Sequence, residues 1–384
     1  MATDTSQAAD LEDLEAGSST LRTVGVEEEL LLVDPTTGAA VPAGSAVLAA
    51  ATALPVGALE SELQEQQVET ATTPVRTIRG LGEELVALRR AADVAAGVTG
   101  ARVAALATSP LPVLPRLSDG SRYRAIDAQM GLTCQEQLTC GCHVHVAIDG
   151  AEEGVAVLDR IRSWLPLVTA LAANSPFWDG RDTSYASYRT QAWSRWPGTG
   201  PTDVFGSAAA YRDVVDRMLG TGTLLDAGMV YFDARLSHRH PTVEIRVADV
   251  CLDVRDTMLV AALCRALVQT AADQWRTGVP PSTQPTVLVR LAAWRASRFG
   301  LSGELVHPVD DRLVPARDAL SALLRHVSVA LEEAGELAWA RREVSALLAR
   351  GTGAARQRAE VARGAGLSTV VARAVDATVA DRRG

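Results

Sequence analysis

The chain of 384 residues contains no lysine, and all 37 of its basic residues are arginines. A P-loop needs the lysine of its Gly-Lys-Ser/Thr motif, and a protein kinase needs a lysine on one of its strands. Schiff-base and pyridoxal chemistry need a lysine amine. These classes are therefore excluded, and any nucleotide phosphate has to be held by arginine, metal ions and backbone N–H groups.

Long apolar runs, paired cysteine motifs and an excess of positive charge are absent as well. No apolar run reaches the length of a membrane span, and the acidic N-terminus lacks the hydrophobic segment of a signal peptide. The five cysteines form no Cys-x-x-Cys motif, which fits a reducing compartment. The net charge of −9 argues against a nucleic-acid binder. We therefore expect a cytoplasmic protein with neither a membrane nor a nucleic-acid partner.

The order of predicted elements indicates the fold class. We expect residues 1–20, which are acidic and rich in Ala, Ser and Thr, to form a disordered tail. Residues 21–384 are expected to form a single catalytic domain whose C-terminal part is helical. Strands are predicted over 23–33, 102–108, 142–148, 228–236 and 241–250, and helices over 81–96, from about 152 to 174, and from 253 onward. Because this is no regular βα alternation, we predict an α+β fold with an antiparallel sheet and helices on one face.

Three predicted strands each carry two chemically strong residues at positions i and i+2, which share one face of a strand. They are TVGVEEELLLVD with Glu27 and Glu29, CGCHVHVAI with His143 and His145, and TVEIRVADV with Glu244 and Arg246. If these strands belong to one sheet, a single surface gathers carboxylates, imidazoles and a guanidinium. Such a set suits divalent metal ions and phosphate, and it indicates an enzyme.

Electrostatics favours a cation between these groups. Two carboxylates about 4 Å apart repel by roughly 4 kcal/mol at an effective dielectric constant near 20. A half-buried face does not gather such groups without a counter-charge, and Mg²⁺ or Mn²⁺ is the natural candidate for oxygen ligands with an imidazole. A zinc site at Cys140, Cys142 and His143 is less favoured, because Cys-x-Cys-His is no standard finger spacing, and we expect these cysteines to pack as small apolar side chains.

Each patch alone also allows a plainer interpretation. Glu27 and Glu29 could face solvent on an edge strand, a His-x-His pair could be structural, and Glu-x-Arg is usually an ordinary ion pair. The joint occurrence favours the site. Glu28 lies between the two acids on the opposite, apolar face of the strand, where we expect a strand edge or a salt bridge and assign no functional role.

A fourth acidic stretch, ELQEQQVETATTP, contains Glu62 and Glu69. Their separation of seven residues would send them to opposite faces of one straight strand, so a bulge or turn has to intervene if both serve one site. Taken alone, the stretch is typical of a solvated polar segment.

Two further segments are candidates for ligand contact. The segment 177–201 is long and rich in aromatics and arginines, so it suits a substrate-covering lid, although a surface loop folded on itself is equally compatible. In the Gly-rich segment 350–358, Arg356 and Arg358 could reach a phosphate, whereas a solvated helix start is the default interpretation.

With these motifs in view, the chain resembles the carboxylate-amine ligase family of glutamate–cysteine ligase type 2, within the glutamine synthetase-like superfamily. The resemblance runs from about residue 22 to 365. It is carried by TVGVEEELLLVDPTTG, ELQEQQVETATTPV, CGCHVHVAI, ANSPFWDGRDTSYASYR, YFDARLSHRHPTVEIRVADVC, WRASRFGL and RGTGAARQR. It implies a curved antiparallel sheet with helices on its outer face, whose concave face holds ATP and two or more Mg²⁺ or Mn²⁺ ions.

The resemblance also implies roles for individual residues. Glu27, His143 and Glu244 look like ligands of one metal ion beside the nucleotide phosphates. Glu29, Glu62 and Glu69 look like ligands of another ion near the substrate carboxylate. His145 resembles a phosphate-facing histidine, and Arg246 an arginine that stabilises the transferring phosphoryl group. We add Arg356 and Arg358 as candidates for cofactor binding, and Tyr185, Tyr188 and Arg189 as candidates for the covering loop.

The implied activity is ATP-dependent amide formation through an acyl phosphate. The acid would be the γ-carboxylate of glutamate or a similar acid, and the amine would be one such as cysteine, although no feature of the chain selects a thiol amine. A phosphoryl-transfer enzyme of the guanidino-kinase type, a metal-dependent hydrolase and a binding protein without turnover remain as alternatives. The Glu244–Arg246 pair speaks against the hydrolase, because a guanidinium suits a phosphoryl group better than a bound hydroxide. A homodimer is the default for a soluble enzyme.

Overall fold

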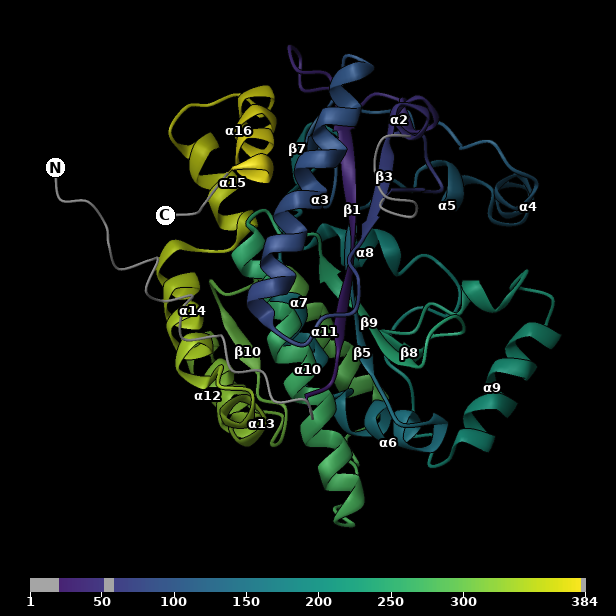
Figure 1. Ribbon diagram of the computed structural model, residues 1–384, viewed down its shortest axis with the longest axis vertical. Helices are drawn as coiled ribbons and strands as arrows, with labels where there is room; N and C mark the ends of the chain where they lie inside the picture. The colour runs from purple at the N-terminus through teal and green to yellow at the C-terminus, as the bar shows by residue number, and fades with distance from the viewer. Residues whose placement is uncertain (1–20, 52–58, 381–384) are drawn as a thin grey trace, which may run out of the picture.

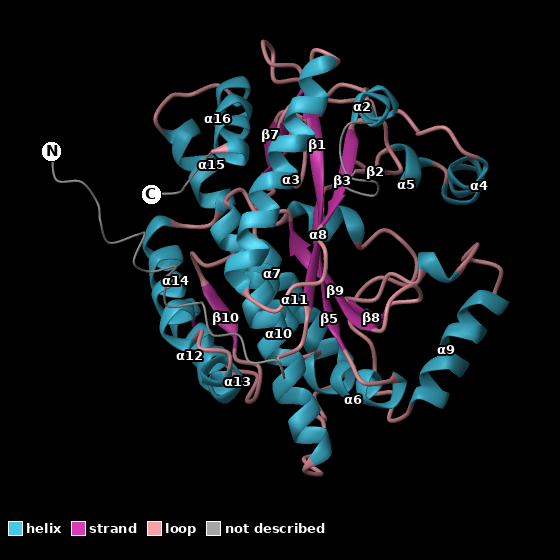
Figure 2. Cartoon of the chain, viewed as in Figure 1, coloured by secondary structure: helices cyan, strands magenta, loops and turns pink. Residues whose placement is uncertain are grey.

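The computed structural model describes residues 21–51 and 59–380, so the predicted tail at 1–20 lies outside the described residues. Its centre is an open sheet with the strand order β2-β3-β1-β5-β9-β8, and β4 pairs with the C-terminal part of β1. All of these pairs are antiparallel (Figures 1 and 2). The strands are β1 (Val24–Val33), β2 (Glu60–Ser61), β3 (Gln67–Ala71), β4 (Arg102–Ala104), β5 (Gly141–Ala147), β8 (Ala234–Leu236) and β9 (Thr242–Asp249).

Helices make up most of the remaining regular structure. They are α2 (Gly44–Ala50), α3 (Ile78–Val98), α4 (Ser121–Met130), α5 (Leu132–Gln135), α6 (Ala151–Ile161), α7 (Leu165–Ala172), α8 (Tyr188–Trp193), α9 (Ala208–Gly220), α10 (Val254–Arg276), α11 (Thr286–Phe299), α12 (Ala316–His326), α13 (Ser328–Glu333), α14 (Leu337–Arg350), α15 (Gly353–Ala362) and α16 (Leu367–Val379). Two small hairpins accompany them, β6 (Phe177–Trp178) with β7 (Arg181–Asp182), and β10 (Glu304–Val306) with β11 (Leu313–Pro315).

The predicted combination of an antiparallel sheet with helices is confirmed, whereas the curvature of the sheet stays a prediction. The strands predicted at 23–33, 142–148 and 241–250 form nearly as expected. The strand predicted at 228–236 is mostly wrong, because only Ala234–Leu236 of this range forms a β-strand. The side chain of Arg235 donates to the carbonyls of Gly228 and Val230, and these hydrogen bonds fold the preceding residues into a compact turn instead of a ladder.

Three other expectations need correction. The helix predicted from about 152 to 174 is two helices, because Pro166 lies in the first turn of α7 and starts a new helix there. The strand predicted at 102–108 ends at Ala104, and the next backbone N–H, at Ala105, donates to the hydroxyl of Thr378. The region after Asp253 is helical as expected, except for the β10–β11 hairpin.

The helical side of the sheet is built around a buried ion pair. Arg89 of α3 binds both carboxylate oxygens of Glu28 at 2.7 Å, and the hydroxyl of Thr257 in α10 donates to the same carboxylate at 2.7 Å. Neither charged side chain is exposed. The salt bridge expected for Glu28 is therefore confirmed, and the expected strand edge is wrong, since β1 is paired along both of its edges. In Figure 1, α3 and α10 lie across β1.

Among the described helices, none combines the length and the apolar character that crossing a lipid bilayer requires.

The first prediction concerns the stability of this ion pair. Arg89→Leu leaves the Glu28 carboxylate buried without its cation, so we expect the free energy of unfolding to fall by about 3–5 kcal/mol. Urea unfolding measures the loss. The double variant Glu28→Gln/Arg89→Leu should lose less, because no charge remains buried. As a control, Arg217→Ala breaks an exposed ion pair with Asp213 in α9 and should cost less than about 1 kcal/mol. A loss from Arg89→Leu no larger than the control would contradict the prediction.

Candidate active site

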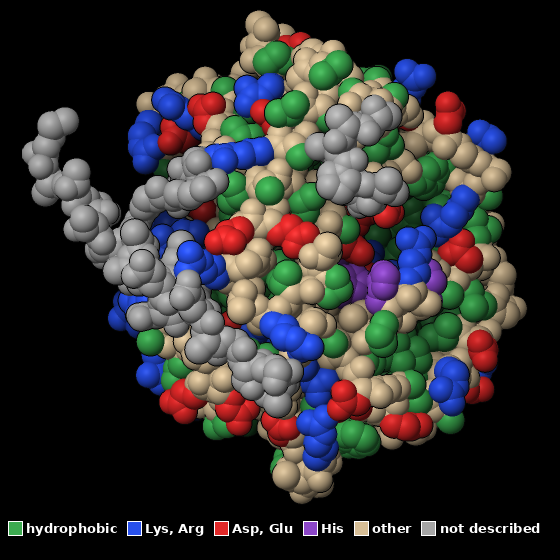
Figure 3. Space-filling view, viewed as in Figure 1, with side chains coloured by type: hydrophobic (Ala, Val, Ile, Leu, Met, Phe, Trp, Pro, Cys, Tyr) green, Lys and Arg blue, Asp and Glu red, His purple; other side chains and the backbone are tan. Residues whose placement is uncertain are grey.

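The face of the sheet opposite Glu28 opens into a cleft of about 900 Å³. In Figure 3, histidine side chains gather in a hollow of the surface with acidic and basic groups around it. The predicted residues that line the cleft are Glu27, Glu29, Glu62, Glu69, His143, His145, Arg189, Glu244 and Arg246. The structure therefore brings the three patches and the fourth acidic stretch together on one surface.

Strand register decides which of these residues meet. Glu27 of β1 lies opposite His143 of β5, and on its other edge Glu29 lies opposite Glu69 of β3. His145 lies opposite Glu244 of β9. Directly opposed residues have neighbouring side chains on one face of the sheet. The cleft consequently has a carboxylate-rich end at β3 and an end with histidine and arginine at β9.

Glu62 reaches the cleft because the chain turns between β2 and β3. Residues 62–66 form this turn, so the odd spacing from Glu69 no longer separates the two side chains. Both side chains line the cleft, and the proximity of Glu62 helps to raise the pKa of Glu69. The intervening turn that the spacing required is thus present.

Glu27 holds both histidines of the cleft. Its carboxylate lies 3.3 Å from Nδ1 of His143 and 3.2 Å from Nε2 of His145. Burial alone would raise the pKa of Glu27, but the bonds to the two imidazoles lower it well below its usual range. Burial and the charge of Arg246 lower the pKa of His143 to about 4. At neutral pH, Glu27 is therefore ionised and His143 is neutral, which is the form of histidine that binds metal ions.

The opposite end of the cleft concentrates negative charge. Burial and the neighbouring Glu62 raise the pKa of Glu29 to about 7, and burial with the same neighbour raises the pKa of Glu69 well above its usual range. One oxygen of Glu29 accepts a hydrogen bond from the backbone N–H of Gly141 at 2.5 Å. Within the described residues, no arginine forms a salt bridge with these three acids. A bound cation would relieve their repulsion.

Glu244 is neutralised by the protein itself. Arg235 approaches its carboxylate at 2.8 Å, and Arg246 forms a second ion pair with it. Burial raises the pKa of Glu244, but the two guanidinium groups outweigh it and lower the pKa well below its usual range. Sequence reasoning missed Arg235, which is the cross-strand partner of Glu244 on β8. Its signal was its place in the segment YFDARLSHRH, seven positions before the first residue of β9.

An aromatic wall stands beside Arg246. Its guanidinium carbon lies 5.9 Å from the ring centre of Trp193 and 6.0 Å from that of Tyr231. Trp196 also lines the cleft, and its indole N–H is buried with no hydrogen-bond partner among the residues that the structure describes. Sequence reasoning noted the aromatic content of 177–201 but did not identify these rings as cleft residues.

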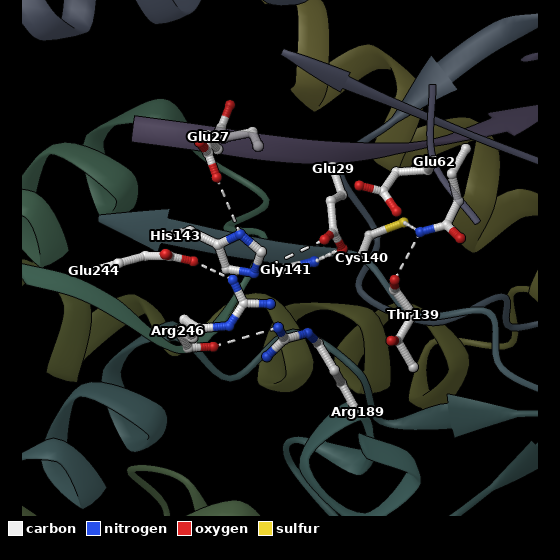
Figure 4. A network of polar contacts seen from close by, with 12 residues as sticks. Glu27, Glu29, Glu62, Thr139, Cys140, Gly141, His143, Arg189, Glu244 and Arg246 are labelled. Carbon is white, nitrogen blue, oxygen red and sulfur yellow. Dashed lines mark hydrogen bonds and ion pairs between the residues drawn. The ribbon is translucent and has the colours of Figure 1, made fainter. Parts of the chain in front are cut away.

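Arg189 is the one member of the expected covering loop, among Tyr185, Tyr188 and Arg189, that lines the described cleft. Its buried guanidinium lies beside strand β5 and donates to the carbonyl of Arg246 at 3.3 Å (Figure 4). A side chain at position 141 would collide with this guanidinium, so Gly141 leaves the space that Arg189 occupies. The two tyrosines contact each other instead, with ring centres 5.9 Å apart. The segment is folded as β6–β7 and α8 rather than as an open loop.

Arg356 and Arg358 are placed outside the cleft. Arg358 pairs with Asp182 at 2.6 Å and donates to the carbonyl of Tyr185, and Arg356 lies 3.7 Å from Asp253. Neither arginine is among the residues that line the described cleft.

The donor atoms suit hard divalent cations. Among the described residues, two sets of possible ligand atoms occur, Glu27 with His145 and Glu244, and Glu27 with Glu69 and His143. Within each set, the atoms lie within 4.8 Å of one another. The expected grouping of His143 with Glu244 differs from this arrangement, because register makes His145 the direct neighbour of Glu244. Carboxylate oxygens with one imidazole fit Mg²⁺ and, still better, Mn²⁺. Neither group contains a cysteine, and all five cysteines are buried and unpaired.

Comparison with known sequences adds the family. Residues 23–373 match the family described as glutamate-cysteine ligase family 2 (GCS2). A protein of Streptomyces avermitilis named "Putative glutamate–cysteine ligase 2-1" is 54% identical over 360 residues, which cover 93% of this chain and 99% of that protein. "Putative glutamate–cysteine ligase 2" of Streptomyces coelicolor is 53% identical over 362 residues, covering 94% of this chain and all of that protein (100%).

Solved structures resemble the fold. A glutamate–cysteine ligase of Francisella tularensis in complex with AMP superposes with a TM-score of 0.67 at 14% identity, covering 94% of this chain and 90% of that one. A bifunctional glutathione synthetase of Pasteurella multocida gives a TM-score of 0.69 at 13% identity, covering 97% of this chain and 53% of that one. Sequence and fold agree, and the chain belongs to the glutamate-cysteine ligase family 2.

Proposed function

We propose that this protein is an ATP-dependent ligase that joins a carboxylic acid to an amine through an acyl phosphate. The acid would be the γ-carboxylate of glutamate or a similar acid, and the amine one such as cysteine. One observation carries the proposal: carboxylate and imidazole groups of β1, β3 and β5 line the same cleft as the guanidinium groups of Arg189 and Arg246. Figure 4 shows Glu29 and His143 beside these two arginines. Family membership supports the same activity.

The chemistry would proceed in two steps. A carboxylate oxygen of the acid attacks the γ-phosphorus of ATP, the bond to the bridging oxygen breaks, and ADP leaves. The amine nitrogen then attacks the acyl carbon, inorganic phosphate leaves with the C–O electron pair, and the nitrogen loses a proton. The first step spreads negative charge over the phosphoryl oxygens, so catalysis is mostly positioning and cationic stabilisation.

The residues divide this work according to their charge. Arg246 would stabilise the charge that develops on the transferring phosphoryl group, because its guanidinium is fixed by Glu244 and by the aromatic wall. Arg189 would offer a second guanidinium to the carboxylate or its acyl phosphate. Trp193 and Tyr231 would limit the access of water, which would otherwise hydrolyse the acyl phosphate.

The acids would hold two or more Mg²⁺ or Mn²⁺ ions. Glu27, His145 and Glu244 supply one set of donors, and Glu27, Glu69 and His143 supply the other, with Glu29 and Glu62 beside it. When bound, such ions would act as Lewis acids toward phosphate oxygens. A cytoplasmic location and a homodimer remain predictions from the sequence.

The second prediction tests the activity. With Mg²⁺ and ATP, glutamate and related acids are incubated with a panel of amines that includes cysteine, and mass spectrometry of the product is compared with ADP release. We expect one amide per ADP. Arg246→Ala should lower kcat by about 100- to 1000-fold, because one fixed contact to the developing charge is lost.

Arg312→Ala serves as the matched control, since Arg312 is exposed and pairs only locally with Asp310. ADP release without amide would favour the guanidino-kinase type of phosphoryl transfer. Cleavage of an amide by the metal-loaded protein in the absence of ATP would favour a hydrolase. Either result would contradict the proposed ligase.

The third prediction concerns pH and metal ions. The pKa of Glu29 is raised from 4.5 to about 7, so the folded state favours its protonated form. The metal-free protein should therefore lose about 3 kcal/mol of stability as the pH rises from 4.5 to 7 on account of this group alone. Mn²⁺ should restore stability at neutral pH, since it binds the ionised cluster.

Urea unfolding from pH 4.5 to pH 8, with EDTA or with MnCl₂, measures both effects. Glu69, Asp233 and Asp256 also have raised pKa values, so the difference between the native protein and Glu29→Gln isolates Glu29. Glu304→Gln, at an exposed position, is the control. A Glu29→Gln protein with the same pH slope and the same gain from Mn²⁺ as the native protein would refute this assignment.

A further inference from the structure

The motif RGTGAARQR at residues 350–358 lies away from the cleft, although the sequence suggested a phosphate contact. It spans the end of α14 and the first half of α15, and none of its residues is among those that line the described cleft. In Figure 1, α15 lies on the side of the molecule away from β8 and α9. Its contacts therefore indicate a different role.

Helix α15 is hydrogen-bonded to Ala173 and Asn174, the two residues that directly follow α7. The side-chain amide of Gln357 donates to both oxygens of Asn174, to the backbone carbonyl at 3.0 Å and to the carboxamide at 2.7 Å. The backbone N–H of Ala354 donates to the carbonyl of Ala173 at 3.0 Å. A side chain at position 353 would collide with the carboxamide of Asn174, so Gly353 is required for this close approach.

The contact continues from Asn174 to the end of β9. Asp249 is 1% exposed, and its carboxylate accepts hydrogen bonds from the backbone N–H of Asn174 at 2.8 Å and from the hydroxyl of Ser175 at 2.7 Å. Its other oxygen accepts from the hydroxyl of Ser187 at 2.8 Å. A single buried carboxylate thus joins the beginning and the end of the segment 174–187.

One residue, Ser175, connects this carboxylate to Arg189 through two hydrogen bonds. The hydroxyl of Ser175, which binds Asp249, accepts the backbone N–H of Arg189 at 3.0 Å. Ser187 is the N-cap of α8, on whose first turn Arg189 lies. The backbone position from which the Arg189 side chain enters the cleft is therefore fixed by Asn174, Asp249 and the two serines.

Helix α15 holds the middle of the same segment as well. Arg358 binds the carboxylate of Asp182 with two nitrogens, at 2.6 and 2.9 Å, and donates to the carbonyl of Tyr185 at 2.9 Å. One helix, α15, consequently binds the segment 174–189 at Asn174 and again at Asp182 and Tyr185. The other end of this segment, at Arg189, reaches the cleft.

We infer that α15 is a positioning element of the active site: through Asn174, Asp249 and Ser175 it sets where the Arg189 guanidinium stands in the cleft. Gln357, Asp249 and Arg358 are positioning residues, because they act through Arg189 and touch no reacting group. The inference rests on the proposed ligase activity, in which Arg189 meets the carboxylate of the acid or its acyl phosphate. A misplacement of about 1 Å at such a group lowers activity by as much as about 100-fold.

The fourth prediction tests this inference with Gln357→Ala, which removes both bonds to Asn174. We expect the KM for the acid to rise at least about tenfold, while the KM for ATP and the Kd of MgADP stay unchanged. In a background of Arg189→Ala, adding Gln357→Ala should have no further effect on kcat/KM, since both changes act through one guanidinium. Arg363→Ala, at the exposed residue that directly follows α15, is the matched control and should behave as the native protein.

Hydrogen exchange provides a readout that needs no turnover. In Gln357→Ala, the amides of 174–190 should exchange faster while those of β1 and β5 keep their protection. A Kd for MgADP that rises tenfold in Arg358→Ala or Gln357→Ala would overturn the inference in favour of a nucleotide contact. The inference would also be overturned if Gln357→Ala lowered kcat/KM in the Arg189→Ala background as much as it does in the native protein. If the native protein forms no amide with any acid, the ligase proposal fails, whereas the exchange experiment still decides whether α15 holds the segment.

Discussion

The burial of carboxylates is the constraint on which this structure depends. A carboxylate removed from water without a counter-charge costs several kcal/mol, and β1 places three glutamates in succession at the centre of the sheet. Because strand side chains alternate, Glu28 enters the helical core, where Arg89 and Thr257 satisfy it, and Glu27 and Glu29 enter the cleft. One face of β1 thereby binds α3 and α10 through Glu28, and the other face presents Glu27 and Glu29 to the cleft as possible cation ligands.

The buried carboxylates are compensated in different ways at the two ends of the cleft. At β9, the protein supplies the cations itself, since Arg235 and Arg246 neutralise Glu244. At β3, burial and the neighbouring Glu62 raise the pKa values of Glu29 and Glu69, so these carboxyl groups depend on protons or on a bound cation for relief of their repulsion. The resulting gradient, from carboxylates to guanidiniums across a short distance, matches a reaction in which phosphate oxygens need cations on one side and fixed positive charge on the other.

Local periodicity was enough to place the three strand pairs on one surface, and long-range register decided their partners. The i and i+2 spacing was sufficient to place Glu27 with Glu29 and His143 with His145, because it depends only on the pleat of a strand. Which histidine faces Glu244 depends on the alignment of β5 with β9, which lies about 100 positions away in the chain and leaves no local signal. Arg89 and Arg235 escaped prediction for the same reason: each resembles any surface arginine until the fold brings it to a buried glutamate. The segment 177–201 shows the opposite case, since its loop-like composition concealed a hairpin, a helix and a buried arginine, whereas its covering role stays a prediction.

The position of Arg189 shows why a distant motif matters to the cleft. Arg189 stands on α8, which has six residues, and a helix this short is not stable in isolation. The arginine side chain also has many rotamers, so its guanidinium takes a defined position in the cleft only if other segments of the chain fix the backbone of Arg189. Asp249 provides the anchor from the sheet and α15 provides it from the C-terminal part of the chain, while Gly141 leaves room for the side chain. The guanidinium of Arg189 therefore owes its position to residues that carry no reactive group. These are Gly141, Gly353 and Gln357, and each acts through geometry alone.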